Sequence, residues 1–284
     1  MTVRATAPSP TDVRPVGDGV DSGAARLDHR PGRGGAPGWR TVATHAGMET
    51  RLLVRNGEQL LVAVVIPLLA LIVLDRTALL DGSLVVGQRR IDLALPGVLA
   101  LGLLSTAFTS TAITTGFDRR YGVLRRLGAT PLTRAGLLGG KVLSVGVVAL
   151  GQVLVLTTAG ALLGWRPTTA GRSGVGSGLL LSVLAVAALV PVALLVGGTM
   201  RAEATLAVAN IVYVLLLGLS AVLVPADRYP APVTTVARLL PSGALAEGLR
   251  SVLTGGRLSV AAVAVLVTWS VAASAACVRF FRWD

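Results

Sequence analysis

Residues 117–134 read Phe-Asp-Arg-Arg-Tyr-Gly-Val-Leu-Arg-Arg-Leu-Gly-Ala-Thr-Pro-Leu-Thr-Arg, a basic stretch that separates two long apolar runs. It holds five arginines, and Lys141 follows shortly after it. Because the flanking runs are apolar enough to enter a bilayer, this group of charges has to lie outside the hydrocarbon core. The stretch therefore sets the orientation of the segments on either side of it.

The composition of the 284-residue chain is typical of a polytopic membrane protein. Hydrophobic residues make up 53%, charged residues make up 14%, and the mean hydropathy is +0.73. A soluble domain needs more polar surface than this. The net charge of +12 is better explained by arginines that meet anionic lipid headgroups than by binding to nucleic acid.

Six apolar runs predict six transmembrane helices and hence an all-α fold, since one span takes about 20 residues. The predicted spans are 59–75, 93–115, 142–164, 179–200, 205–224 and 258–278. The first span is short. Pro67 and Pro191 should kink the first and the fourth span, and a neighbouring helix or polar side chain should satisfy the carbonyl that each proline frees.

The segments that flank these runs have their own predictions. Residues 1–36 are rich in Pro, Gly, Arg, Asp and Ala and are expected to form a disordered cytoplasmic tail before the transmembrane domain at 37–284. Residues 38–57 predict an amphipathic helix at the membrane interface. Residues 231–240 and 244–253 predict two short helices that re-enter the outer leaflet, because neither is long enough to span.

The distribution of positive charge orients this layout. With the N-terminus inside, about two thirds of the 26 Lys and Arg residues fall on the inner side. The loop 117–141 alone carries six of them. Both termini are therefore expected to be cytoplasmic.

Three familiar kinds of chemistry find no support in the sequence. Gly139-Gly140-Lys141 lacks the rest of a phosphate-binding loop, and Lys141 is interpreted as a side chain that snorkels to the membrane boundary. Pro241-Ser242-Gly243 has no histidine or lysine nearby to act as a base, so it predicts a helix-breaking turn instead of an intramembrane hydrolase. A single cysteine and a membrane part without histidine leave no disulfide and no metal site.

Polar side chains inside the apolar runs are the other features to explain. The second run carries a stripe of serines and threonines, which either lines a cavity or bonds to its own backbone and lets helices pack closely. Asn210 is a candidate for a hydrogen bond between helices. Glu203 is expected to pair with Arg201 at the inner surface.

Residues 117–128 predict a short amphipathic helix on the inner side. Tyr121, Leu124 and Leu127 would share one face, with arginines around the other. Asp118 would lie in the first turn, where the helix dipole favours a carboxylate, and the Thr-Pro pair at 130–131 would end the helix. The residues alone leave two interpretations open, a positively charged anchor or a lever for a soluble partner.

At this point the chain resembles a family. Residues 118–134 are similar to the coupling-helix region of type-2 ABC exporter permeases, among them the daunorubicin-resistance-like exporters of bacteria. The shared pattern is an acidic-basic start, a Gly-x-Leu-[Lys/Arg]-Arg-Leu core and a Thr-Pro-Leu ending. Residues 51–56 resemble the stretch before the first span, and residues 240–250 resemble the outer-leaflet segment before the last one. Many relatives have Glu where this chain has Asp118.

The resemblance, which covers residues 38–284, implies partners and a mechanism. Two permease subunits, identical or similar, would pair around a central path in the bacterial plasma membrane. A separate ABC ATPase subunit would hold ATP and Mg, so this chain would bind no cofactor and would not itself be an enzyme. The cargo would be an amphiphilic drug, antibiotic or lipid-like compound that is moved outward. The alternative is a membrane scaffold or sensor that recruits a soluble partner without transport.

The resemblance also assigns residues to roles. The residues expected to couple the chain to the ATPase are Asp118, Arg119, Tyr121, Leu124, Arg125 and Leu127, with Arg51 and Arg55 on the interfacial helix. Spans one, two and five would lie near the subunit interface. The candidates for the translocation path or the dimer interface are therefore Thr106, Thr109, Ser110 and Asn210.

Overall fold

The computed structural model describes residues 38–84, 88–130, 132–166, 171–220, 222 and 229–281, and the predicted tail at 1–36 lies outside them. Throughout the described ranges the regular elements are helices, as the all-α prediction requires. They are α1 (Gly38–Arg55), α2 (Gly57–Arg76), η1 (Ala78–Ser83), α3 (Arg90–Leu104), η2 (Ser105–Ser110), α4 (Thr111–Arg120), α5 (Val123–Gly128), α6 (Arg134–Leu162), α7 (Gly171–Thr199), α8 (Ala202–Leu219), α9 (Ala231–Leu239), α10 (Pro241–Gly255) and α11 (Val260–Phe280).

Five helices within the described ranges are long and apolar enough to cross a membrane. They are Arg90–Arg120, Arg134–Leu162, Gly174–Thr199, Ala202–Leu219 and Val260–Phe280. They contain or closely match the second to sixth predicted spans. The predicted first span falls within α2, whose 20 residues reach about 30 Å, the thickness of a hydrocarbon core. That span stays a prediction.

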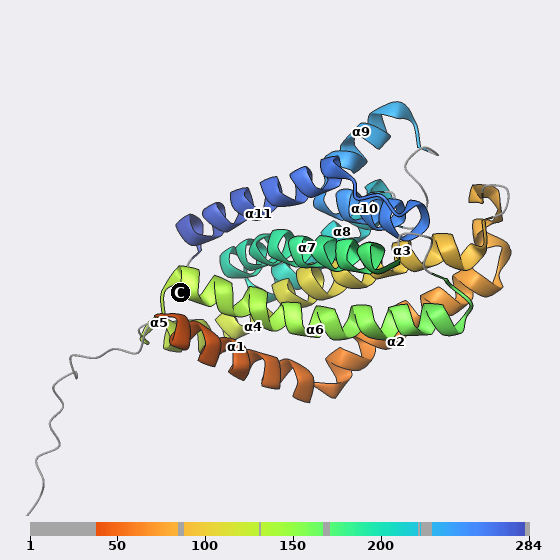
Figure 1. Cartoon of the computed structure of the whole chain (residues 1–284). Coiled ribbons are helices and arrows are strands. Elements are labelled where there is room, and N and C mark those ends of the chain that lie inside the picture. The colour runs from red at the N-terminus through yellow and green to blue at the C-terminus, as the bar shows by residue number, and fades with distance from the viewer. Residues whose placement is uncertain are drawn as a thin grey trace, which may run out of the picture. The chain divides into compact units, whose positions relative to one another are not determined.

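The central helix of the bundle is α7, which packs against α11, α4, α10 and α6 (Figure 1). Many of its apolar side chains are buried, among them Leu181, Leu189 and Leu194. The rod formed by α3, η2 and α4 is the most deeply buried of the five candidate spans. Within the rod, η2 is a π-helical stretch, a distortion that often marks a functional position in a helix.

One end of the bundle gathers the basic segments. The end of α4, α5, the start of α6 and the end of α11 lie together there (Figure 1). The Arg134 guanidinium donates to the carbonyls of Val278 and Arg279 over 3.4 and 3.3 Å, which ties α6 to α11. We call this end of the bundle the basic end.

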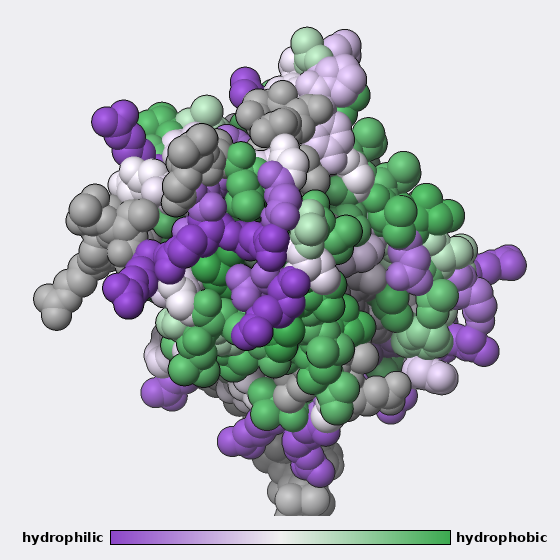
Figure 2. All heavy atoms as spheres, turned by 90° about the vertical axis from the view of Figure 1, so that its right-hand side faces the viewer, coloured by the Kyte–Doolittle hydropathy of each residue, from purple (hydrophilic) through white to green (hydrophobic). Residues whose placement is uncertain are grey.

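The opposite end carries η1, the start of α3 and α10 (Figure 1). Arg90 pairs with Asp81 over 2.6 Å, and this hydrogen bond holds the pKa of the exposed Asp81 carboxyl below its usual range. Viewed from this end, hydrophilic residues gather in a patch, and hydrophobic surface extends beside it (Figure 2). This pattern suits a helix bundle whose sides meet lipid and whose ends meet water.

The predicted helix at 117–128 is wrong as a single element. The α4 helix continues the second span to Arg120, the chain turns at Tyr121 and Gly122, and α5 starts at Val123. Gly122 has a φ of 69°, a left-handed conformation that glycine adopts readily and that ends a helix. Asp118 therefore lies near the C-terminal end of α4 and not in the first turn of a separate helix.

The two short helices predicted before the last span are present as α9 and α10. Leu240 between them is extended, and Pro241 takes the first position of α10, where its missing N–H costs no hydrogen bond. The α10 helix is largely buried against α7, α3 and α11. Their re-entry into the outer leaflet stays a prediction.

The carbonyl that Pro67 frees in α2 has a polar side chain as its partner, as the sequence predicts. Proline has no N–H, so it frees the carbonyl of Ala63, four residues earlier in α2. The side-chain amide of Gln152 on α6 donates to that carbonyl. The Thr106 hydroxyl in η2 donates to the Gln152 carbonyl oxygen over 3.0 Å. Gln152, which is buried, thus joins three helical segments.

We expect Gln152→Leu to lower the stability of the protein by about 1–3 kcal/mol, because the Ala63 carbonyl and the Thr106 hydroxyl lose their partner. Adding Pro67→Ala should recover part of this loss, since an alanine at position 67 supplies the missing N–H to Ala63. Thermal unfolding in detergent of the two single variants and the double variant measures the effect. Strictly additive effects of the two changes would contradict the assignment.

Candidate functional site

The six predicted ATPase-contacting residues between 118 and 127 lie at the basic end, but they do not share one exposed face. Tyr121 is 65% exposed on the turn after α4, and Arg125 is exposed on α5. Leu127 is half-buried, whereas Leu124 is fully buried in the core of this chain. Leu124 therefore fixes α5 to the bundle and leaves Tyr121 and Arg125 as the accessible part of this group. Their role toward an ATPase stays a prediction.

The α1 helix packs mainly along α6, and glycines make the close approach possible. A Cβ atom at Gly140 would lie 2.4 Å from the ring of His45, and one at Gly136 would lie 3.5 Å from Val42. The buried residues of α1 are His45, Ala46 and Glu49. The spacing of four between His45 and Glu49 places both on the side that meets α6. Arg51 and Arg55, the predicted contacts, are exposed on α1.

Next to this contact lies a cluster of four ionisable residues, His45, Glu49, Asp118 and Lys141, which we call the lysine cluster. The Lys141 ammonium donates to Glu49 Oε2 over 2.9 Å and to Asp118 Oδ2 over 3.3 Å. Lys141 is only 4% exposed, while the Asp118 side chain at the edge is 25% exposed. One cation therefore joins three helices, α1, α4 and α6.

His45 is the fourth member of the lysine cluster and is buried. Its Nε2 lies 4.0 Å from Glu49 Oε1. Burial lowers the pKa of the His45 imidazole, and the Lys141 ammonium acts in the same direction against the Glu49 and Asp118 carboxylates. A neutral His45 leaves two carboxylates around one ammonium, so the cluster has a formal charge of −1 when both carboxyls are ionised.

Lys141 is the functional candidate that the sequence interpretation missed. The snorkelling interpretation is wrong, because the amine is buried and held by two carboxylates. Two signals in the sequence point to the pairing. Lys141 is the only lysine of the chain, and it follows two glycines that let a neighbouring helix approach. Its partner Glu49 lies on an amphipathic helix one turn after a histidine.

A groove at the basic end lies between α4 and the α7–α8 turn. Arg120 pairs with Glu203, so the predicted pairing of Glu203 with Arg201 is wrong. Arg119 donates to the carbonyl of Met200 over 3.4 Å. The groove has a volume of about 550 Å³ and is open to solvent. These contacts fix the end of α4, and with it the start of α5, to the end of α7 and the start of α8.

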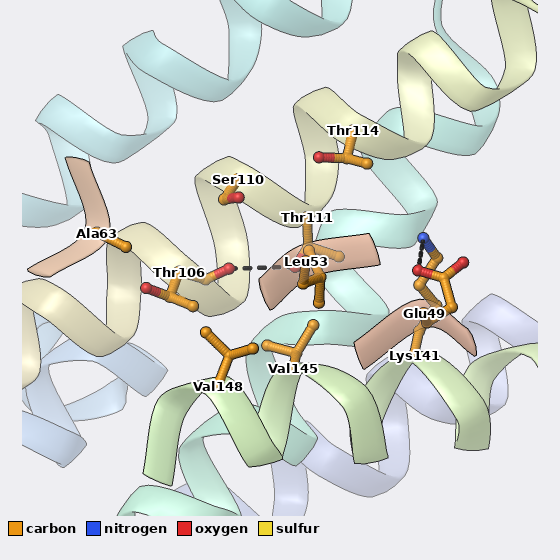
Figure 3. A pocket seen from close by; sticks show the side chains of 10 residues that line it. All are labelled: Glu49, Leu53, Ala63, Thr106, Ser110, Thr111, Thr114, Lys141, Val145 and Val148. Carbon is orange, nitrogen blue, oxygen red and sulfur yellow. Dashed lines mark hydrogen bonds and ion pairs between the residues drawn. The ribbon is translucent and has the colours of Figure 1, made fainter. Parts of the chain in front are cut away.

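The serines and threonines of the stripe bond to the backbone of their own rod and also line a cavity, and Thr111 does both. Thr111 and Thr115 donate to carbonyls of their own rod, as the packing interpretation predicts. Thr106 and Ser110, with Thr114, line a small cavity of about 30 Å³ whose other side is formed by residues such as Val145 (Figure 3). Such a volume holds one or two water molecules. Glu49 and Lys141 close one end of this cavity.

The remaining path candidates lie apart from this cavity. Asn210 is exposed on α8 and donates to the carbonyl of Leu206 on its own helix over 3.0 Å, and among the described residues it has no hydrogen bond to another helix. The Thr109 hydroxyl is buried and has no partner among the described residues. Neither residue lines the cavity beside the lysine cluster. Their role in a path or a dimer interface stays a prediction.

Comparison with known families identifies the class of protein. The family model described as ABC-2 family transporter protein matches residues 87–279, which is more than half of the chain. Among curated proteins none matches the chain. The chain therefore belongs to the ABC-2 family of transporter proteins.

Family membership confirms the coarse prediction made from residues 118–134. Members are membrane subunits of ABC exporters and are generally not catalytic, and membership implies an ABC ATPase partner and a surrounding lipid bilayer. The long apolar helices agree with a multi-pass membrane protein. The daunorubicin-resistance-like subtype stays a prediction.

Proposed function

We propose that this chain is the transmembrane subunit of a daunorubicin-resistance-like ABC exporter in the bacterial plasma membrane, with both termini cytoplasmic. It moves an amphiphilic drug, antibiotic or lipid-like compound outward. A separate ABC ATPase subunit binds ATP and Mg and supplies the energy. A second permease subunit, identical or similar, completes the path.

The observation that carries this proposal is the arrangement of α5 at the basic end. Its exposed side presents Arg125, next to the exposed Tyr121, while the buried Leu124 holds it to the core. An element that is exposed to a partner and fixed to a bundle can pass a displacement into that bundle, because packed interiors deform little. The arginines suit a partner surface of complementary charge.

The positions of α5 and of the end of α11 support the orientation. The α5 helix and the end of α11 lie at the basic end, which is the arginine-rich end that the positive-inside rule places in the cytoplasm (Figure 1). From α5 to the end of α11 the chain runs through α6, α7, α8 and α11, an even number of candidate spans. With α2 as a further span, the fold has six crossings and α1 also lies inside.

The cavity beside the lysine cluster supports an amphiphilic cargo. Thr106 and Ser110 line it together with the apolar side chains of Val145 and Val148 (Figure 3). Sites for small amphiphiles typically combine apolar walls with a few polar groups. The cavity is small in this one chain, and a second permease subunit would extend the path beyond it.

The docking role is tested with charge and contact changes on the exposed residues only. We expect Tyr121→Ala with Arg125→Glu to weaken binding of the ABC ATPase subunit by roughly tenfold or more, as for an interface hot spot. Membrane insertion should be unchanged, because both side chains are exposed. Co-purification from membranes and ATP hydrolysis of the purified complex measure the two effects.

A matched control is Arg238→Glu, which reverses an exposed charge on α9, away from the basic end. It should leave ATPase binding at the wild-type level. Wild-type chain that binds no ABC ATPase, or a docking variant that binds as tightly as the control, would contradict the proposal. Capture of a different soluble partner by the wild type would favour the scaffold or sensor.

A further inference from the structure

We propose that Lys141 is a positioning residue that joins α1 to the α4–α5 segment, so that the two move as one unit. The consequence for transport rests on the proposed function, but the joint itself rests on geometry alone. Two segments would face the ATPase, the exposed side of α5 and the arginines of α1. The lysine cluster is the ionic link between them inside this chain.

Lys141 connects two carboxylates that lie on different helices. Glu49 and Asp118 are both acidic and repel each other, and the Lys141 ammonium lies within hydrogen-bond distance of both. Asp118 is separated from α5 by only one turn of chain. A displacement of α5 therefore reaches Asp118 almost directly, and from there Lys141 transmits it to Glu49 on α1.

The buried position of Lys141 has an energetic cost. Removing an ammonium and a carboxylate from water costs several kcal/mol per ion, and replacing a buried ion pair by well-packed apolar residues is often neutral or stabilising. Stability alone therefore does not account for a buried lysine at this position. The ion pair instead provides a defined geometry, because the two carboxylates together fix the position of the Lys141 ammonium.

The lysine cluster has open space beside it. Glu49 and Lys141 line the small cavity (Figure 3), and the Asp118 side chain is partly exposed to solvent. The Glu49–Lys141 pair thus has room to shift without forcing apolar side chains apart. The ion pair can therefore stay formed while α1 and the end of α4 shift together.

The experiment first uses the full-length permease alone. Cys277 is replaced by Ala, and spin labels are placed on cysteines introduced at Met48 of α1 and Ala129 after α5, both exposed in the structure. Double electron–electron resonance in nanodiscs then gives the distribution of distances between the two spin labels. Three charge states are compared: wild type, a neutral pair (Lys141→Met with Glu49→Gln) and a swapped pair (Lys141→Glu with Glu49→Lys).

We expect a narrow distribution for the wild type, a broader one for the neutral pair and a narrow one again for the swapped pair. The matched control is Arg90→Met with Asp81→Asn, which neutralises an exposed ion pair at the opposite end and should change nothing. A neutral pair as narrow as the wild type would overturn the proposal. So would a swapped pair as broad as the neutral pair.

The second arm uses the complex with the ABC ATPase. We expect the neutral pair to keep ATPase binding but to lose roughly tenfold in substrate-stimulated hydrolysis, within the range usual for coupling between two sites. Full stimulation in the neutral pair would overturn the link to transport. A wild-type chain that binds no ATPase would refute the proposed function instead, and the distance measurement would still decide whether the joint exists.

Discussion

Lys141→Met alone is expected to destabilise the protein by about 3–5 kcal/mol, the usual cost of removing one partner from a buried ion pair. The variant leaves the Glu49 carboxylate, whose side chain is 10% exposed, without its counter-ion. Adding Glu49→Gln should recover most of the loss, since no unpaired charge then remains beside the cavity. Asp118 is partly exposed and can stay hydrated without Lys141.

Unfolding of the detergent-solubilised protein by added denaturing detergent measures these free energies in a double-mutant cycle. The control is Arg238→Met, which removes an exposed charge and should stay within about 0.5 kcal/mol of wild type. A Lys141→Met variant as stable as this control would mean that the amine is no buried counter-ion. Effects of the two cluster changes that simply add would mean the same.

The second large effect is expected for Gly243→Ala in α10, with a loss of about 3 kcal/mol or more from overpacking. A Cβ atom at Gly243 would lie 1.9 Å from the carbonyl oxygen of Ala237 and 3.2 Å from that of Ser220. Both obstacles are backbone, so no rotation of a side chain relieves the clash. The hydrogen bond between Ser220 and Ser242, 2.6 Å long, fixes the same junction.

The yield of folded protein from membranes and the thermal unfolding midpoint measure this loss. Gly255→Ala is the matched control on the same helix, because nothing lies within 4 Å of its Cβ position. That change should be neutral or slightly stabilising, as alanine favours helix over glycine. Equal behaviour of the two variants would show that the α9–α10 junction is not packed as tightly as described.

The apolar runs predicted most of the fold, because length and composition alone are enough to predict a transmembrane helix. Five of the six predicted spans are contained in, or closely matched by, described candidate spans. The carbonyl freed by Pro67 was also predictable, because a proline inside a helix lacks the N–H that would bond to it. Its partner Gln152 was not, because the sequence carries no information on which of several polar residues faces α2.

The errors have local and long-range causes. The interpretation of 117–128 as one helix followed its helical spacing and missed that Gly122 ends α4. Spacing also placed Leu124 on an apolar face without telling whether that face meets a partner or the core of the chain. Lys141 was missed because its partner Glu49 lies 92 residues away, a pairing that only the packed helices create.

The enclosure of Lys141 has a practical consequence for chemical labelling. The chain has no other lysine, so its side-chain primary amine chemistry is confined to one position inside the lysine cluster. An amine-reactive reagent then modifies this side chain only while the cluster is open to water. Mass spectrometry can measure the rate of that modification in each nucleotide state. The rate then reports how often the lysine cluster opens, with no introduced label.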